Sequence, residues 1–433
     1  MGMLEIALLL LVLLCLLLAS GLWIALSLAA TGWVAMMIVH PSPGLFLASA
    51  FWESTGSWTL AALPMFIWMG EILFRTRLSE ELFNGLAPWV RRLPGRLLHV
   101  NVLACGIFGS VSGSSAATCA TVSKIALPEL MRRGYDERTA IGSLATSGTL
   151  GIMIPPSIIM VVYAVAAEVS IVRVFIAGMI PGLIVMALFS LYIVVWALLN
   201  PSKQPPPEPR LSLAQKLRQS TQLIPCGLLI LGVIGSMLVG WATATEAAAF
   251  GVLGALILAA LTGSLSWRSF LDSLAGATRL SCMIMFILAG AAFLTKAMAL
   301  TGIPAALATA VADAGLGPYA IIAILTVVYL ILGTALDGVS MIVLTTSVVV
   351  PMVQHAGFDL VWFGIFIVLL VELAEISPPL GFNLFVMQTM TGKEQTEIAW
   401  ASLPFFAMLV LTVALLTVFP ALATWLPDAL LSR

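Results

Sequence analysis

Two stretches of this chain, whose double prolines lie 223 positions apart, set the fold: ATSGTLGIMIPPS at 145–157 and ELAEISPPLGFN at 372–383. Each joins polar residues to a double proline, and two consecutive prolines remove two backbone donors and break a helix. The same offset aligns further residues: Pro128 with Pro351, Gly134 with Gly357, Asp136 with Asp359, and Pro181 with Pro404. Upstream, an offset of 220 aligns Phe66 with Phe286 and Gly70 with Gly290. This constant spacing predicts two related halves.

The composition places the chain in a membrane. Of its 433 residues, 61% are hydrophobic and 9% are charged, and 19 Lys and Arg nearly balance 20 Asp and Glu. An ordinary soluble domain carries about 25% charged residues. The composition therefore excludes a soluble enzyme, a disordered chain and a nucleic-acid binder with a basic face. The apolar stretches do not alternate with a period of two, which excludes β-barrel strands and predicts an all-α polytopic membrane protein.

Other sequence features narrow the chemistry. The apolar run at 4–18 has no Lys or Arg before it, so we interpret it as a first membrane helix rather than a cleaved signal peptide. The five Cys have no metal-like spacing, and the three His lie far apart. We therefore expect no transition-metal site and no cofactor.

A polar segment at 201–219 divides the chain near its midpoint. It contains three consecutive prolines at 205–207 and four basic residues, which indicates a linker. We expect repeat one at 1–200 and repeat two at 220–433. Two stretches that mix charged and apolar residues, about 75–96 and 266–280, are predicted to be surface helices.

Charge in the matched loops predicts how the halves are oriented. The loop after Pro128 carries three Arg between 132 and 138, whereas the loop after Pro351 carries no Lys or Arg. The segment 75–96 carries five Arg, and its partner at about 295–316 carries only Lys296. Lys and Arg collect on the cytoplasmic side. The halves are therefore predicted to be inverted-topology repeats, with a cytoplasmic linker and with both termini outside the cytoplasm.

Each repeat also contains an apolar stretch interrupted by small polar residues. The interruptions are GSVSGSS at 109–115, within about 97–128, and GTALDG at 333–338, within about 318–351. Positive loops flank the first stretch at both ends, so the chain must return to the side it entered. We predict two re-entrant helical hairpins with polar tips, each beside a broken helix at about 139–168 or 360–391.

These motifs resemble the large membrane subunit (M, DctM-like) of tripartite ATP-independent periplasmic (TRAP) transporters. The matching motifs follow the same order over nearly the whole chain: SGSSAAT at 112–118, GTLGIMIPPS at 148–157, ATEAAA at 244–249, LG at 332–333, LD at 336–337, and Glu372 followed by PPLGFN at 378–383. The resemblance implies an elevator-type transporter that takes up organic acid anions, C4-dicarboxylates or similar carboxylates, with sodium across a bacterial inner membrane.

The resemblance also implies two partners. One is a periplasmic substrate-binding protein (DctP-like), and the other is a small four-helix membrane subunit (DctQ-like). Because the two repeats account for all 433 residues, we expect the small subunit to be a separate chain. The termini, outside the cytoplasm by the charge argument, would then be periplasmic.

We expect the anion to lie between the two hairpin tips, and sodium at two sites between each tip and its neighbouring broken helix. The substrate-binding candidates are Ser112, Gly113, Ser114, Ser115, Thr149, Gly338, Ser377 and Asn383. The sodium-binding candidates are Ser110, Ser112, Ser147, Gly148, Gly333, Thr334, Asp337, Glu372, Pro378 and Pro379. No Arg or Lys lies in these loops, so helix N-termini, backbone amides and bound sodium must neutralise the carboxylate.

The chain departs from the family pattern near its second double proline. Ala374 stands where the family often has Gly, and Glu375 stands where it usually has an apolar residue. An extra carboxyl group there has three interpretations: it tunes substrate choice, it adds a proton-sensitive group, or it faces a polar surface.

Three rival functions were compared with this one. A binding-protein-independent sodium/dicarboxylate or ion exchanger with similar hairpins remains the alternative. An intramembrane enzyme would need a nucleophile with a base or a metal cluster, and no His or Cys lies at the paired breaks. A scaffold subunit would leave the duplicated polar breaks unexplained.

Overall fold

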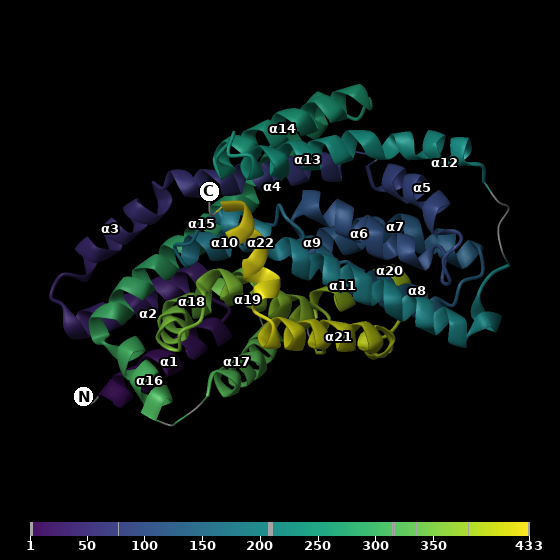
Figure 1. Ribbon diagram of the computed structural model, residues 1–433. Helices are drawn as coiled ribbons and strands as arrows, with labels where there is room; N and C mark the ends of the chain where they lie inside the picture. The colour runs from purple at the N-terminus through teal and green to yellow at the C-terminus, as the bar shows by residue number, and fades with distance from the viewer. Residues whose placement is uncertain are drawn as a thin grey trace.

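The computed structural model describes residues 3–76, 78–206, 211–313, 315, 317–334, 336–379 and 381–431, and every regular element in those ranges is helical (Figure 1). Part of the linker, 207–210, lies outside the described residues. Six of the described helices are long and apolar enough to cross a membrane, or eight if two bent pairs each count as one span. The all-α polytopic architecture expected from the composition is confirmed.

The outer helices of the first half are interrupted by a bend. They are α1 (Met3–Ala19), α2 (Ile24–Val39), α3 (Pro43–Thr55), the short 3-10 helix η1 (Trp58–Ala61) and α4 (Ala62–Phe74). The α3 helix and the η1–α4 segment meet at 53°. Gly56 and Ser57 lie at the break between them.

The outer helices of the second half contain one long continuous helix instead. They are α13 (Ile224–Leu238), α14 (Ala244–Leu261) and α15 (Trp267–Thr301). The segment 266–280 is therefore not a separate helix, as the sequence analysis expected, but the first part of α15. No proline and no loop interrupts this stretch, so the segment of mixed charged and apolar residues continues directly into the apolar part of the same helix. Thr243 and Glu246 form a capping box at the start of α14.

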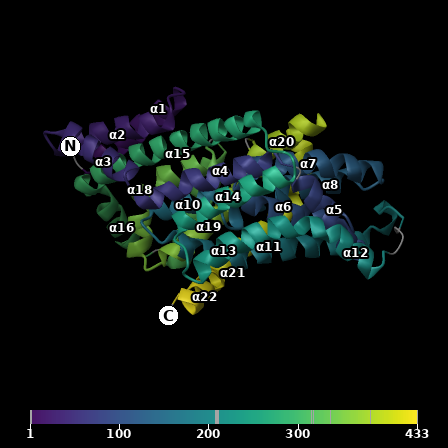
Figure 2. The same cartoon turned by 90° about the horizontal axis from the view of Figure 1, so that it is seen from above.

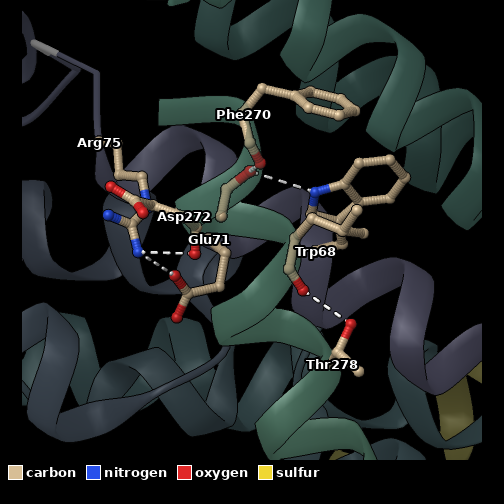
Figure 3. A network of polar contacts seen from close by, with 8 residues as sticks. Trp68, Glu71, Arg75, Phe270, Asp272 and Thr278 are labelled. Atoms are coloured by element: carbon tan, nitrogen blue, oxygen red, sulfur yellow. Dashed lines mark hydrogen bonds and ion pairs between the residues drawn. The ribbon is translucent and has the colours of Figure 1, made fainter. Parts of the chain in front are cut away.

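The two halves exchange their packing partners. Helix α2 of the first half packs along α15 of the second, and α14 of the second packs along α4 of the first. The contact between α4 and α15 includes a polar network (Figure 3). There, the Trp68 indole donates a hydrogen bond to the Ser273 hydroxyl at 3.2 Å, and Arg75 bridges the Glu71 carboxylate and the Asp272 carbonyl, both at 3.2 Å.

The inner elements are two helical hairpins. The first consists of α6 (Leu98–Ser112) and α7 (Ser115–Arg132), and α5 (Leu78–Val90) precedes it. The second consists of α17 (Pro318–Gly333) and α18 (Gly338–His355), and α16 (Ile303–Asp313) precedes it. Helices α7 and α18 begin and end 223 positions apart, which is the offset between the matched Pro, Gly and Asp residues of the two halves.

Each hairpin is followed by a broken helix and then by a long one. The first set is α8 (Glu137–Ser147), α9 (Leu150–Met153), α10 (Ile158–Ala166) and α11 (Ile171–Leu199). The second set is α19 (Leu360–Glu375), α20 (Phe382–Thr391), α21 (Gln395–Val418) and α22 (Ala421–Leu431). Asp136 and Asp359 cap the first helix of each set through backbone amides of Thr139 and Trp362.

Helix α19 forms the centre of the molecule. All residues from Val361 to Ala374 are buried, which agrees with a sequence that is apolar on every side. The short helix α12 (Leu213–Ser220) lies at one end of the molecule in both views, with α5 and α8 near it, while α16 and the N-terminus lie toward the other end (Figures 1 and 2).

Candidate functional site

The first hairpin turns within two residues. Helix α6 ends at Gly113, whose φ of +63° lies in the left-handed region that glycine adopts without strain. Ser114 then caps α7, accepting a hydrogen bond from the amide of Ala117. Behind the turn, the hydroxyl groups of Ser112 and Thr118 lie 2.7 Å apart. The tip is therefore held by its own hydroxyl groups, and the N-terminal amides of α7 begin at the turn.

The second hairpin turns at an acidic cap. Asp337 Oδ2 accepts hydrogen bonds from the amides of Val339 at 3.1 Å and Ser340 at 3.3 Å. The Ser340 hydroxyl donates to the other carboxylate oxygen, Oδ1. An added Cβ at Gly333 would lie 2.1 Å from the Ala374 Cβ, so only glycine permits this contact with α19.

The first broken helix bends by 43° at its double proline. The Pro155–Pro156 peptide bond is cis. The Ser157 hydroxyl donates to the Ile152 carbonyl at 2.6 Å and accepts from the amide of Met160, so one side chain joins both sides of the break. Gly109 of α6 approaches α9 so closely that an added Cβ would lie 2.3 Å from the Gly151 Cα.

The second broken helix also breaks at a double proline, but no serine joins its two sides among the described residues. The Pro378–Pro379 bond is also cis, and the Ser377 hydroxyl donates to the Leu373 carbonyl at 2.6 Å. Helix α20 begins after Gly381 without a side-chain cap, so its first amides have no side-chain acceptor. The start of α20 at the second break is therefore uncapped, whereas Ser157 caps the start of α10 at the first.

Asn383 connects three of these parts. Its side chain is fully buried, its Nδ2 donates to the Ala145 carbonyl at 2.9 Å, and its Oδ1 accepts from the Ser115 hydroxyl at 3.0 Å. Ala145 belongs to the first broken helix, Ser115 to the first tip, and Asn383 to the second broken helix. One amide thus couples elements from both halves.

A cavity of about 580 Å³ lies where both tips meet both breaks. Its walls come from residues 113–116 of the first tip, 333–334 and 336–339 of the second, Ile158 and Ile159 of α10, Val371, Ala374 and Glu375 of α19, Phe382 and Phe385 of α20, and Leu280, Met283 and Ile284 of α15. These lining residues, all within the described ranges, include no Lys, Arg or His, and their acidic members are Asp337 and Glu375.

Two carboxyl groups near the cavity lack hydrogen-bond partners. Glu372 is fully buried, and neither of its carboxyl oxygens has a partner among the described residues. One turn later on α19, the buried Oε2 of Glu375 also lacks one. A buried carboxylate without a partner is costly, so both groups call for a proton or a cation.

The structure brings part of the predicted site together in the cavity wall. The residues that line it are Gly113, Ser114, Ser115, Gly333, Thr334, Asp337 and Gly338. A second group is buried but does not line it: Ser110, Ser147, Gly148, Thr149, Glu372 and Asn383. Ser112 and Ser377 are half-buried, and Pro378 and Pro379 are exposed.

The sequence analysis missed the apolar side of the cavity. Phe382 and Phe385 of α20 line it, as do three residues from the middle of α15. Apolar residues on an apolar helix carry no distinguishing signal. The spacing of Phe382 and Phe385 immediately after the second double proline is the feature that could have identified them.

Comparisons with known proteins identify the family of the chain. Residues 11–422 match the family model described as the DctM component of the tripartite ATP-independent periplasmic transporter. The chain is 32% identical over 403 residues to the C4-dicarboxylate TRAP transporter large permease protein DctM of Pseudomonas aeruginosa, covering 93% of this chain and 94% of that protein. It is 32% identical over 379 residues to the ectoine/5-hydroxyectoine TRAP transporter large permease protein UehC of Ruegeria pomeroyi, covering 87% of each.

Among solved structures, the YdaH transporter of Alcanivorax borkumensis superimposes with a TM-score of 0.65 at 15% identity, covering 94% of this chain and 98% of that chain. At this identity the likeness shows the fold alone. The relatives are transporter permeases rather than enzymes, and together with the apolar helices they indicate a multi-pass protein of the inner membrane. The family model and the relatives together show that this chain belongs to the DctM family, the large permease component of TRAP transporters.

Proposed function

We propose that this permease couples the inward movement of sodium to the uptake of an organic acid anion, with C4-dicarboxylates the first candidates. The observation that carries the proposal is the cavity between two matched hairpin tips and two matched helix breaks. Broken backbone at membrane depth is tolerated where it lines a cavity, and there helix ends bind ions. One relative is named for C4-dicarboxylate and another for ectoine/5-hydroxyectoine, so the family alone does not fix the substrate.

The charge distribution of the site supports a bound cation. The cavity wall contains two carboxyl groups and no basic side chain, so an anionic substrate must find positive charge elsewhere. The N-termini of α7 and α20 offer partial positive charge, and sodium supplies the rest.

Two candidate sodium sites follow from the orphaned polar atoms. In the first, between the first tip and α8, the buried Ser147 hydroxyl has no hydrogen-bond partner among the described residues. Ser110, Ser112 and Gly148 complete that candidate set. In the second, both oxygens of buried Glu372 lack partners, and we place it with Gly333, Thr334, Asp337, Pro378 and Pro379. Oxygen atoms of this kind suit a hard cation.

Contacts between distant segments support a common orientation. The Leu97 amide hydrogen-bonds the Tyr135 hydroxyl, Arg96 donates to the Pro205 carbonyl, and Lys393 pairs with Glu137 at 3.2 Å. These contacts gather arginine-rich segments and the linker at one end of the molecule. By the distribution of Lys and Arg, we assign this end to the cytoplasm and the chain termini to the periplasm.

The remaining parts of the proposal concern motion and partners. We propose that the hairpins and broken helices move as a block against α1–α4 and α13–α15, as in an elevator. A DctP-like periplasmic protein would deliver the substrate, and a DctQ-like four-helix subunit would brace the outer helices.

Proteoliposomes containing this chain, its small partner and a loaded binding protein would test the coupling. Uptake of labelled substrate should require an inward sodium gradient and should stop when potassium replaces sodium. Equal uptake in both gradients would exclude sodium coupling. Uptake without the binding protein would favour the exchanger alternative.

A further inference from the structure

Glu375 places a carboxyl group in the cavity wall without a compensating positive charge. The charged groups that face it, Asp337 and Glu372, are both acidic. The Ser115 hydroxyl of the same wall donates to Asn383 Oδ1, and the buried Oε2 of Glu375 has no partner among the described residues. The fold therefore leaves a negative charge to be neutralised by whatever occupies the cavity.

Asp337, the other acidic residue of the wall, differs in this respect. Its carboxylate accepts hydrogen bonds from two backbone amides and one hydroxyl at the start of α18, so the helix N-terminus offsets its charge. No helix start offsets Glu375 in the same way, because it is the last residue of α19. The C-terminal end of a helix favours cations.

Aromatic rings lie in the same cavity wall. Phe382 and Phe385 are three positions apart on α20, which places them on one face of the helix, and both are largely exposed. Aromatic faces attract cations, particularly alkylated ammonium groups. A carboxylate and two phenyl rings together form a pocket complementary to a cationic nitrogen.

The first hairpin tip supplies the groups that would bind the carboxylate of such a ligand. Residues 113–115 line the cavity at the start of α7, where backbone amides favour a carboxylate. A cavity of about 580 Å³ has the size of a small-molecule site. The wall thus presents an anion-binding end and a cation-binding end to one small ligand.

We propose that the substrate is a small zwitterion, a carboxylate that carries a cationic nitrogen, and that Glu375 is the residue that selects it over a dicarboxylate. A second carboxylate at this position would face Glu375 and Asp337 without a counter-charge. The inference rests on the proposed sodium-coupled uptake of a carboxylate, and it replaces C4-dicarboxylates with zwitterions as the first candidate substrates.

Two isosteres test the role of the nitrogen directly. Glycine betaine and 3,3-dimethylbutyrate have the same shape, but only the former carries a positive charge; succinate adds a dicarboxylate. Binding of each to the purified permease, co-expressed with its small partner, is measured in sodium by the shift of the thermal unfolding midpoint. Working on the permease avoids the selectivity of the binding protein.

In the wild-type protein, we expect glycine betaine to bind at least about tenfold more tightly than 3,3-dimethylbutyrate or succinate, because desolvated charge pairs carry discrimination of this size. The Glu375→Gln variant should lose that preference, and Glu375→Leu should lose it while gaining affinity for 3,3-dimethylbutyrate. Glu397→Gln, which removes a carboxyl group paired with Lys393 outside the cavity, should keep it.

Several results would overturn the inference. The first is that the wild-type protein binds succinate or 3,3-dimethylbutyrate as tightly as glycine betaine. The second is that the wild-type unfolding midpoint responds to sodium but not to glycine betaine. The third is that the Glu375→Gln variant keeps the preference for glycine betaine. Failure of the proposed function is a separate result, because it appears as sodium-independent uptake in proteoliposomes. Sodium-dependent binding of succinate alone would preserve the function and reject the zwitterion.

Discussion

Replacement of Asn383 by Ala should free the first hairpin from both broken helices. The amide is buried and joins Ser115 on α7, the Ala145 carbonyl on α8 and its own helix α20. Alanine keeps the helix but removes both hydrogen bonds. The hairpin would then keep its apolar packing and one strong side-chain hydrogen bond to α8, from the Asn101 amide to the Ser143 hydroxyl at 2.8 Å.

The structure sets the size of the effect. Each lost hydrogen bond contributes about 1 kcal/mol net, and the Ala145 carbonyl left buried without a donor adds about 1 kcal/mol or more. The free energy that holds α7 against α8 should therefore fall by about 3 kcal/mol. Because 1.4 kcal/mol is tenfold in an equilibrium constant, the open population should rise roughly 100-fold.

Cys119 reports this opening without an added probe. It is fully buried on α7, and its sulfur lies 3.8 Å from the Leu144 carbonyl of α8. With the exposed Cys15 and Cys282 replaced by Ser, maleimide labelling of Cys119 measures how often α7 leaves α8. The buried Cys226 on α13, outside the hairpin, serves as the internal reference for global unfolding.

Two comparisons make the labelling experiment decisive. Thr389→Ala lies on the same helix as Asn383, but its hydroxyl donates to the Phe385 carbonyl within α20, so labelling should change less than about threefold. If Asn383→Ala also changes Cys119 labelling by less than about threefold, the amide does not couple the hairpin to the breaks. Equal acceleration at Cys226 would show unfolding of the whole protein instead.

Three further substitutions have defined outcomes. Asp337→Ala removes an N-cap worth about 1 kcal/mol and a candidate sodium ligand, so it should flatten the sodium dependence of uptake. The control Asp136→Ala removes a similar cap outside the cavity and should leave the sodium dependence intact. Glu168 has a φ of +55°, so Glu168→Gly should raise the unfolding midpoint by relieving about 1 kcal/mol of strain, whereas Glu168→Ala should not. Gly109→Ala would place a Cβ 2.3 Å from the backbone of α9 and should lower the unfolding free energy by about 2 kcal/mol. In the control Gly227→Ala, the added Cβ meets no atom within 4 Å, so the change should be neutral or stabilising.

Local chemistry allowed the sequence to locate the helix breaks and the tips. Pro155–Pro156 and Pro378–Pro379 cannot continue a helix, and Ser114 and Asp337 are residue types that start one. These constraints act over a few residues, so they are visible without a structure. The matched bounds of α7 and α18 follow from the same local rules applied twice.

Long-range packing could not be inferred in this way. The sequence gives no sign that α15 runs unbroken to Thr301 and contributes Leu280 and Met283 to the cavity. Its counterpart bends by 53° at Gly56 and Ser57, although residues of the same two types occur inside the unbroken α15. Whether an apolar helix bends depends on what packs against it, and that information is spread over the whole chain.

The exchange of partners between α2 and α15 and between α14 and α4 has a consequence for biosynthesis. A ribosome that has just inserted the first half leaves α2 and α4 in the bilayer without the helices they pack against. The nascent chain must keep these surfaces from other proteins until translation of the second half is complete. The two halves can therefore pack against each other only late in synthesis, once α15 has entered the membrane and contacts α2 and α4.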